Sequence, residues 1–227
     1  MSTGDLLREV RVAPSILSAD FARLGEQVAE VLSAGARVIH VDVMDGHFVP
    51  PITIGPLVVA ALREQVEQVG GVLDVHLMIE RPERHVDDFV KAGAHSVTFH
   101  AEATPHAAYA ASLVREGGAC VGIAINPATP VGVLAEMGEL IDMALCMTVN
   151  PGWGGQPFIG HSLEKIERLR HILPERVALE VDGGIDPLTA GRCRTAGANL
   201  FVAGSAVFGT PDPAGAYRAI VEAARAV

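Results

Sequence analysis

The sequence predicts a single-domain α/β fold, a (β/α)8 TIM barrel. Eight short apolar runs alternate with longer amphipathic segments, so that each βα unit takes up about an eighth of the 227 residues. The phrase Ala-Gly-Ala recurs at 34–36, 92–94 and 196–198, each time between a helical pattern and the next apolar run. Polar or glycine-rich residues follow nearly every run, and no GxGxxG fingerprint opens the first helix. An open doubly wound sheet is the alternative, which periodicity alone does not exclude.

The strands are expected where apolar and β-branched residues cluster between turn signals. Each run is followed by polar residues or glycine, as the carboxyl ends of barrel strands usually are. No change of composition marks a linker, so one domain over residues 1–227 is expected. In chain order the predicted strands are 12–17, 38–43, 72–77, 96–99, 120–125, 143–149, 177–181 and 200–202.

The helices are expected in the amphipathic segments between these runs. Ser18 or Asp20 offers an N-cap for the first helix, while Pro82 and Pro187 suit a first helical turn. Glycines follow several of the predicted helix ends, where a left-handed residue commonly stops a helix. The predicted helices are 21–33, 57–68, 82–92, 105–115, 131–137, 162–171, 187–195 and 213–226.

The composition argues against several classes of function. The net charge is -10 at pH 7 and no basic stripe occurs, whereas nucleic-acid binding needs clustered Lys and Arg. No apolar segment approaches the roughly 18 residues of a membrane span, and no signal peptide is expected, so we expect a cytoplasmic location. The only lysines, Lys91 and Lys165, lie in helical stretches away from the predicted strand ends, which argues against a Schiff-base aldolase. Cys120, Cys146 and Cys193 form no CxxC pair, so buried thiols are expected.

Four metal-competent residues stand near the ends of three predicted strands. His40 and Asp42 are two residues apart and therefore point to the same face of one strand. His76 and Asp182 stand near the ends of two other strands, and in a closed barrel these ends meet at one mouth. Imidazole and carboxylate ligands together suit Zn, Fe(II), Mn or Co. Other histidines, including His85, His95, His106, His161 and His171, are expected to be solvated.

Glycine clusters follow the last three predicted strands. They are residues 150–156, 182–184 and 203–205. Glycine lets the backbone approach an anion closely, and the late loops of such barrels commonly bind phosphate through N–H groups. A phosphate site is therefore expected there, with Trp153 either covering a ligand or packing the loop. Three methionines stand at or beside strand ends and are candidates for an apolar pocket wall: Met44, Met78 and Met147.

The chain resembles the ribulose-phosphate 3-epimerase family over nearly its whole length. The matching runs are Ala13-Pro14-Ser15-Ile16-Leu17-Ser18-Ala19-Asp20-Phe21, His40-Val41-Asp42-Val43-Met44-Asp45-Gly46, Asp74-Val75-His76-Leu77-Met78, Asn126-Pro127-Ala128-Thr129-Pro130, Met147-Thr148-Val149-Asn150-Pro151-Gly152-Trp153-Gly154-Gly155-Gln156, Val181-Asp182-Gly183-Gly184 and Ala203-Gly204-Ser205-Ala206-Val207-Phe208. The resemblance implies a phosphate-binding TIM barrel of the pentose phosphate pathway. Its reaction would interconvert D-ribulose 5-phosphate and D-xylulose 5-phosphate with one divalent metal ion per subunit.

The resemblance also assigns roles to residues. Asp42 and Asp182 would be the acid/base pair and, together with His40 and His76, the metal ligands. Substrate contacts would come from Ser15, His76, Gly152, Trp153, Gly154, Gly155, Gly183, Gly184, Gly204 and Ser205. Trp153 stands where the family usually has phenylalanine, and Pro51 where asparagine is common. Neither residue is a predicted metal ligand or acid/base residue. The two differences therefore bear only on loop behaviour and on substrate preference. A homo-oligomer is also expected, but the sequence does not specify its symmetry.

Three other functions compete with this interpretation. An epimerase of the same mechanism could act on a six-carbon ketose phosphate such as allulose 6-phosphate, which the sequence discriminates poorly. A lyase of the same superfamily would show Asp-x-Lys-x-x-Asp, but the run from Asp42 to Asp45 has no lysine. A non-catalytic sugar-phosphate binding module would be expected to lose Asp42 or Asp182, and both are present.

Overall fold

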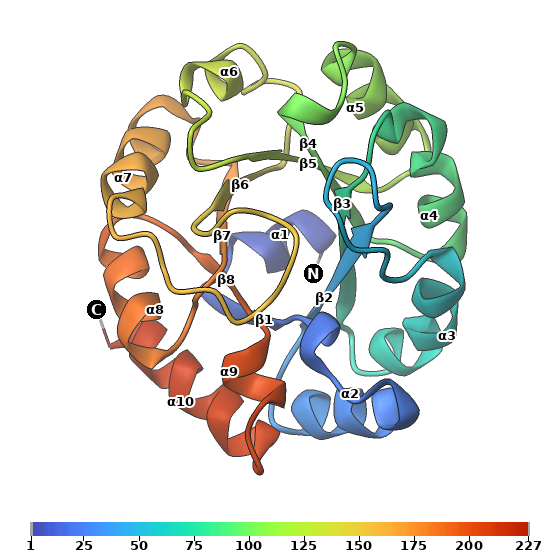
Figure 1. The fold of residues 1–227 in the computed structure, drawn as a ribbon, viewed down its shortest axis with the longest axis vertical. Coiled ribbons are helices and arrows are strands. Elements are labelled where there is room, and N and C mark those ends of the chain that lie inside the picture. Colours follow the sequence, from blue (N-terminus) through green and yellow to red (C-terminus); the bar gives the residue numbers. More distant parts are fainter. Residues whose placement is uncertain (1, 227) are drawn as a thin grey trace.

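Eight parallel strands form the inner wall of the structure, and helices surround them (Figure 1). The computed structural model describes residues 2–226, so Met1 and Val227, the ends of the predicted domain, lie outside the described residues. The strands are β1 Arg11–Pro14, β2 Val38–Met44, β3 Val72–Met78, β4 Ser96–His100, β5 Cys120–Ile125, β6 Met143–Met147, β7 Ala178–Asp182 and β8 Leu200–Ala203. The predicted (β/α)8 architecture is thereby confirmed.

The order of the strands settles the choice between a barrel and an open sheet. Hydrogen-bonded neighbours follow the order β1-β8-β7-β6-β5-β4-β3-β2, so each strand from β2 to β8 lies beside its neighbour in sequence. A single parallel bridge between Ser15 and His40 joins the two ends of this order. A doubly wound sheet would reverse its strand order at a switch point, and this structure does not.

Two strands are shorter than the sequence predicts, and local hydrogen bonds explain both. Strand β1 ends at Pro14 because the Ser15 hydroxyl accepts the backbone N–H of Leu17 and begins the 3-10 helix η1, Ile16–Ser18. Strand β6 ends at Met147, because the carbonyl of the next residue, Thr148, accepts the N–H of Ile159 from the long segment 148–161. That segment passes over the strands in Figure 1.

Helices follow the strands at the predicted places, with some changes of bounds. Asp20, one of the two predicted caps, accepts the N–H of Ala22 and begins η2. The predicted helix over 131–137 is a single turn, and the one over 82–92 is split at His85. The helical elements are α1 Thr3–Arg8, η1 Ile16–Ser18, η2 Phe21–Arg23, α2 Leu24–Ser33, α3 Pro56–Glu67, η3 Pro82–Arg84, α4 Val86–Ala92, η4 Ala101–Ala103, α5 Ala107–Glu116, α6 Gly132–Ala135, α7 Ser162–Ile172, α8 Pro187–Thr195, α9 Ser205–Phe208 and α10 Pro213–Arg225.

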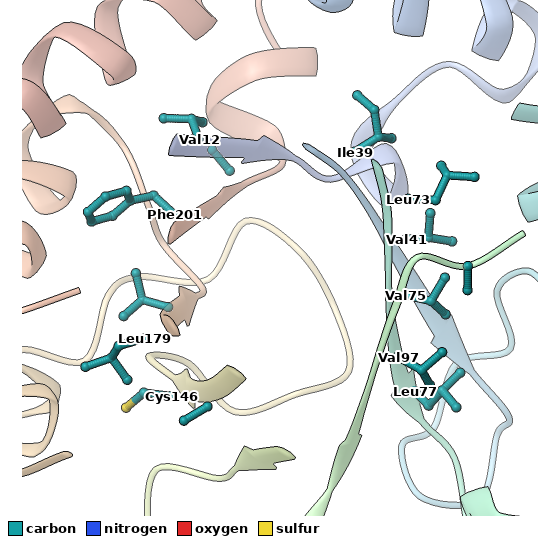
Figure 2. Close-up of a cluster of buried hydrophobic side chains, with 14 of the residues drawn as sticks. Val12, Ile39, Val41, Leu73, Val75, Leu77, Val97, Cys146, Leu179 and Phe201 are labelled. Carbon is teal, nitrogen blue, oxygen red and sulfur yellow. The ribbon is translucent and has the colours of Figure 1, made fainter. Parts of the chain in front are cut away.

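The main core lies between the outer faces of the strands and the helices. Figure 2 shows apolar side chains of this layer directed away from the barrel centre, among them Ile39 and Val41 on β2 and Leu179 on β7. Side chains alternate along a strand, so the residues between them point into the barrel. On β2 these are Val38, His40, Asp42 and Met44, so the polar His40 and Asp42 lie between an apolar residue at the start of the strand and another at its end.

Helix α1, which the sequence pattern did not predict, closes the opposite end of the barrel. Ser2 and Asp5 form a capping box at its start. Leu6 and Leu7 are buried against inward residues near the strand starts, including Val38 and Met143. Among residues 2–226, the structure has no helix that is both long enough and apolar enough to cross a membrane.

Candidate metal centre and active site

The structure brings the four predicted metal ligands together at the carboxyl ends of three strands. His40 and Asp42 lie on β2, His76 on β3 and Asp182 at the end of β7. One ligand atom from each lies within 4.8 Å of those from the other three. The register explains the meeting of the first three, because Asp42 pairs directly with His76 across β2 and β3.

The distances within this quartet are those of groups that face one point. Nε2 of His40 lies 3.3 Å from Oδ1 of Asp42. Nδ1 of His76 lies 3.1 Å from the same oxygen and 3.7 Å from Oδ2 of Asp182. The second oxygen of Asp42 accepts a 2.5 Å hydrogen bond from the Ser15 hydroxyl. Ser15, predicted to touch the sugar, thus also orients a predicted acid/base residue.

The surroundings of the two aspartates shift their pKa values in opposite directions. Burial raises the pKa of Asp42, but the adjacent imidazoles of His40 and His76 outweigh it and hold the pKa well below its ordinary value. Burial and the nearby Asp42 carboxylate raise the pKa of Asp182 to about 7. Burial also lowers the pKa of His76 to about 4, which favours a neutral imidazole. Two carboxyl groups whose pKa values are pushed apart suit opposite roles in proton transfer.

The donor atoms fit a divalent metal ion. Nε2 of His40 is buried and finds no hydrogen-bond partner among residues 2–226, although it faces two carboxylates. A buried polar atom normally has a hydrogen-bond partner or a bound ion. A nitrogen without a partner that faces a cluster of possible metal ligands therefore indicates a metal-binding position. Two imidazoles and two carboxylates are a donor set for Zn, Fe(II), Mn or Co. The quartet is therefore a candidate metal site.

A second polar layer lies directly beneath the quartet, inside the barrel. Nδ1 of His40 lies 2.7 Å from Oδ2 of Asp74, whose other oxygen accepts the hydroxyl of Ser96. A carboxylate of Glu180 lies 3.6 Å from the same nitrogen. Burial and the neighbouring Asp74 carboxylate raise the pKa of Glu180 well above its ordinary value. Asp74 thus holds the His40 ring with Nε2 directed toward the quartet.

A further histidine, which the sequence pattern did not single out, contacts the quartet from β4. The ring of His100 is fully buried, and its Nε2 lies 2.9 Å from Nε2 of His76. On its other side Nδ1 lies 3.3 Å from Oε2 of Glu102 in η4. In the sequence, the polar residues Ser96, Thr98 and His100 alternate with the apolar Val97 and Phe99. This alternation could have predicted that His100 points into the barrel.

One cavity opens at the mouth above the quartet, and it collects most of the residues predicted to bind substrate. Ser15, Asp42 and Asp182 lie at its floor, with the three methionines on the wall. The glycine clusters complete the lining: Gly152, Trp153, Gly154, Gly155, Gly183, Gly184, Gly204 and Ser205. His76, also predicted to touch substrate, is fully buried and does not line the cavity. Leu17, Ser18, Val149, Ile185 and Val202 also line it, although they were not predicted to bind substrate.

Close contacts explain why glycines stand in these loops. Gly184 has φ +65°, and a Cβ there would lie 2.7 Å from the backbone nitrogen of Phe158. A Cβ on Gly204 would lie 2.7 Å from Oγ of Ser18. The loops after β6, β7 and β8 therefore pack closely around the cavity.

Two expectations need correction. Of the five histidines expected to be solvated, His95 is half-buried, because its Nδ1 accepts the N–H of Leu73. Lys165 lies on a helix as predicted, but it is buried and its ammonium group donates to the carbonyls of Asn126 and Pro127, just after β5. An amphipathic helix pattern does not reveal how far such a long side chain reaches.

Comparison with known proteins agrees with this geometry. The model of the ribulose-phosphate 3 epimerase family matches residues 11–208. The chain belongs to this family. The ribulose-phosphate 3-epimerase of Bacillus subtilis (strain 168) is 50% identical over 207 residues, covering 89% of this chain and 94% of that relative. The ribulose-phosphate 3-epimerase of Escherichia coli (strain K12) is 45% identical, covering 96% of each. The curated relatives of the chain are thus enzymes, epimerases of a sugar phosphate.

Solved structures outside the epimerase family share the fold. KGPDC from Streptococcus mutans aligns with a TM-score of 0.75 at 15% identity, covering 95% of this chain and 97% of the other. A 3-hexulose-6-phosphate synthase aligns with a TM-score of 0.72 at 22% identity, covering 95% and 99%. At such identities the likeness supports the barrel architecture alone.

Proposed function

We propose that this member of the epimerase family interconverts D-ribulose 5-phosphate and D-xylulose 5-phosphate by removing and returning the proton on C3. The observation that carries the proposal is the placement of Asp42 and Asp182. Both carboxylates line one cavity, between a candidate metal site and three glycine loops. Inversion at C3 requires a proton acceptor and a proton donor at the same carbon, and two aspartates provide both.

The two aspartates act as a pair. The proton on C3, beside the C2 ketone, goes to one carboxylate, while the other carboxyl group delivers a proton to the opposite face of the resulting enediolate. In the reverse direction they exchange roles. Ser15 holds Asp42 through the hydrogen bond to Oδ2. A divalent ion held by His40, Asp42, His76 and Asp182 would supply Lewis-acid stabilisation of the negative charge that develops on the oxygens at C2 and C3.

The phosphate of the substrate is proposed to lie among the glycine loops. Gly183, Gly184 and Gly204 line the same cavity as Ser205, which begins helix α9. Their close packing leaves backbone free of side chains at this end of the cavity, as anion binding by N–H groups requires. Met44, Met78 and Met147 would cover the apolar side of the sugar chain and exclude water from the enediolate.

The decisive test of this function is a comparison of substrates. Purified protein is expected to epimerise ribulose 5-phosphate, to exchange the C3 proton with deuterium from solvent, and to show a lower kcat/KM with allulose 6-phosphate. A coupled assay, with elemental analysis of the same sample to identify the metal, measures this. A higher kcat/KM for the six-carbon substrate would favour the alternative epimerase, and binding without turnover would favour a non-catalytic module.

The Gly184→Ala variant tests the proposed phosphate end. A side chain at φ +65° costs about 1–2 kcal/mol, and the new Cβ would also push the segment around Phe158 away. We expect a lower melting temperature and a clear rise in KM for ribulose 5-phosphate. Gly35→Ala is the matched control, because Gly35 has φ +108° with nothing within 4 Å of the new Cβ. An unchanged KM in Gly184→Ala would contradict a phosphate site beside Gly184.

The metal that occupies the quartet is proposed to be Zn, Fe(II), Mn or Co, in keeping with two nitrogen and two oxygen donors.

The sequence-based expectations of a homo-oligomer and of a cytoplasmic location remain predictions. The exposed apolar side chains Ile52 and Leu57, 81% and 87% exposed, lie in or next to the loop after β2, and an association surface there would cover them.

A further inference from the structure

His40 and His76, the two histidines of the quartet, have different hydrogen-bond partners on the ring nitrogen that points away from the quartet. Nδ1 of His40 contacts a carboxylate directly, at Asp74. His76 instead contacts a second imidazole, that of His100, which then contacts Glu102. The first arrangement is the usual support of a metal-bound imidazole, whereas the second places one more residue between the ligand and the carboxylate.

The contact between the two rings allows only two arrangements of protons. Two imidazole nitrogens 2.9 Å apart form a hydrogen bond only if one carries a hydrogen and the other a lone pair. Glu102 fixes the outer end of the chain. Burial opposes its charged form, but contacts with His100, Thr129 and Asn126 outweigh burial and lower the pKa of Glu102 to about 2. An ionised carboxylate only accepts, so Nδ1 of His100 carries a hydrogen.

The role of His76 in the quartet then selects one arrangement. A metal ligand must present a lone pair, and it is Nδ1 of His76 that faces Asp42 and Asp182. Its hydrogen must therefore be on Nε2, which donates to the lone pair on Nε2 of His100. Nε2 of His100 then accepts, and its Nδ1 donates to Glu102. Both hydrogen bonds run in one direction, from the quartet toward the carboxylate.

The loops after β4 and β5 hold the far end of this chain in place. Oε1 of Glu102 accepts the backbone N–H of Asn126 at 2.8 Å and also the hydroxyl of Thr129. The ammonium group of Lys165 in turn binds the carbonyls of Asn126 and Pro127. The ring of Phe48 packs against His100 with centroids 4.7 Å apart. The carboxylate is thus fixed by groups outside the quartet.

We propose that His100 and Glu102 are positioning residues that fix the tautomer and the orientation of His76, so that its Nδ1 is a metal ligand. The chain of contacts runs from His76 through His100 to Glu102 and ends in the loop at Asn126 and Thr129. Neither positioning residue lines the substrate cavity. Their effect therefore falls on metal affinity first, and on turnover only through it. This inference rests on the proposed metal site.

Titration of the metal-depleted full-length protein with Co²⁺, followed by visible absorption, tests the inference. Removing the support of a metal-bound histidine typically weakens metal binding about 10- to 100-fold. We expect that increase in the Kd for Co²⁺ in His100→Phe, and a smaller one in Glu102→Gln. His100→Gln should recover part of the affinity, because its side-chain oxygen can accept the hydrogen of His76. In ¹⁵N-labelled, Zn²⁺-loaded protein, NMR should show the hydrogen of His76 on Nε2.

Thr98→Val is the matched control. Thr98 lies on the same strand and face as His100, is fully buried, and its hydroxyl has no hydrogen-bond partner in the described chain. Its Kd for Co²⁺ should equal that of the wild type. Wild-type Kd values in both His100→Phe and Glu102→Gln, or a hydrogen on Nδ1 of His76, would overturn the inference. If His100→Phe does not fold, Glu102→Gln and the NMR measurement decide. A wild-type protein that takes up no metal would overturn the metal site itself.

Discussion

Asp42→Asn and Asp182→Asn are each expected to lower kcat for ribulose 5-phosphate by about 10²- to 10⁴-fold, the contribution of a positioned acid or base. Asparagine keeps the shape of the side chain and one oxygen, but it neither accepts nor returns a proton at C3. Because both carboxylates are needed for one inversion, either replacement alone should produce this decrease. Steady-state kinetics with elemental analysis of each variant separates the loss of a proton carrier from the loss of metal.

Exchange of the C3 proton with deuterated solvent sharpens this experiment. Each aspartate serves one face of C3, so a variant lacking one of them should still exchange the proton of one epimer without forming the other. Asp142→Asn is a matched control, because Asp142 accepts the backbone N–H of Val121 and lies before strand β6, at the far end of the barrel from the cavity. Near wild-type turnover in both Asp42→Asn and Asp182→Asn would refute the two-aspartate mechanism.

Removal of the metal with a chelator is expected to have the second-largest effect. Turnover should fall at least about 10³-fold, because a carboxylate alone does not abstract a proton as weakly acidic as that on C3, and an ion supplies several kcal/mol of charge stabilisation. The melting temperature should fall as well. An ion present at a thousand times its Kd stabilises the folded state by about 4 kcal/mol.

Restoration identifies the metal. Zn, Mn, Co and Fe(II) added singly to the chelated protein should restore activity to different extents, with full recovery for the natural ion. His40→Gln controls for non-specific effects of the chelator, since its melting temperature should respond less to chelation than that of the wild type. Full activity in a sample shown by elemental analysis to contain no metal would exclude a metal-dependent reaction.

The barrel and the quartet could be predicted from the sequence because both depend on short-range alternation. His40 and Asp42 share a face on any straight strand, whatever surrounds them. Their meeting with His76 and Asp182 followed from closure of the sheet. The exact strand ends were less predictable, because Ser15 and Thr148 leave β1 and β6 through hydrogen bonds to neighbouring segments.

The polar layer beneath and beside the quartet was harder to predict. Asp74, Glu180 and His100 each stand two residues from another inward-facing residue on the same strand. The alternation of side chains therefore predicts that they point into the barrel, but it does not predict which residues they contact there. Glu180 contacts His40 only because β7 and β2 face each other across the closed barrel. Likewise, Leu6 and Leu7 are too few to predict a buried helix until the barrel end that they cover is known.

The placement of α1 and β1 has a consequence for synthesis on the ribosome. Strand β1 takes its ladder of hydrogen bonds from β8 and only one bridge from the neighbourhood of β2. Helix α1 packs against Ala178 and Leu200. Helix α1 and strand β1 therefore complete their packing only after residues near 200 have been synthesised. Ring closure is expected only after β8 has left the ribosome, and until then β1 lacks its main hydrogen-bonding partner and is available to chaperones.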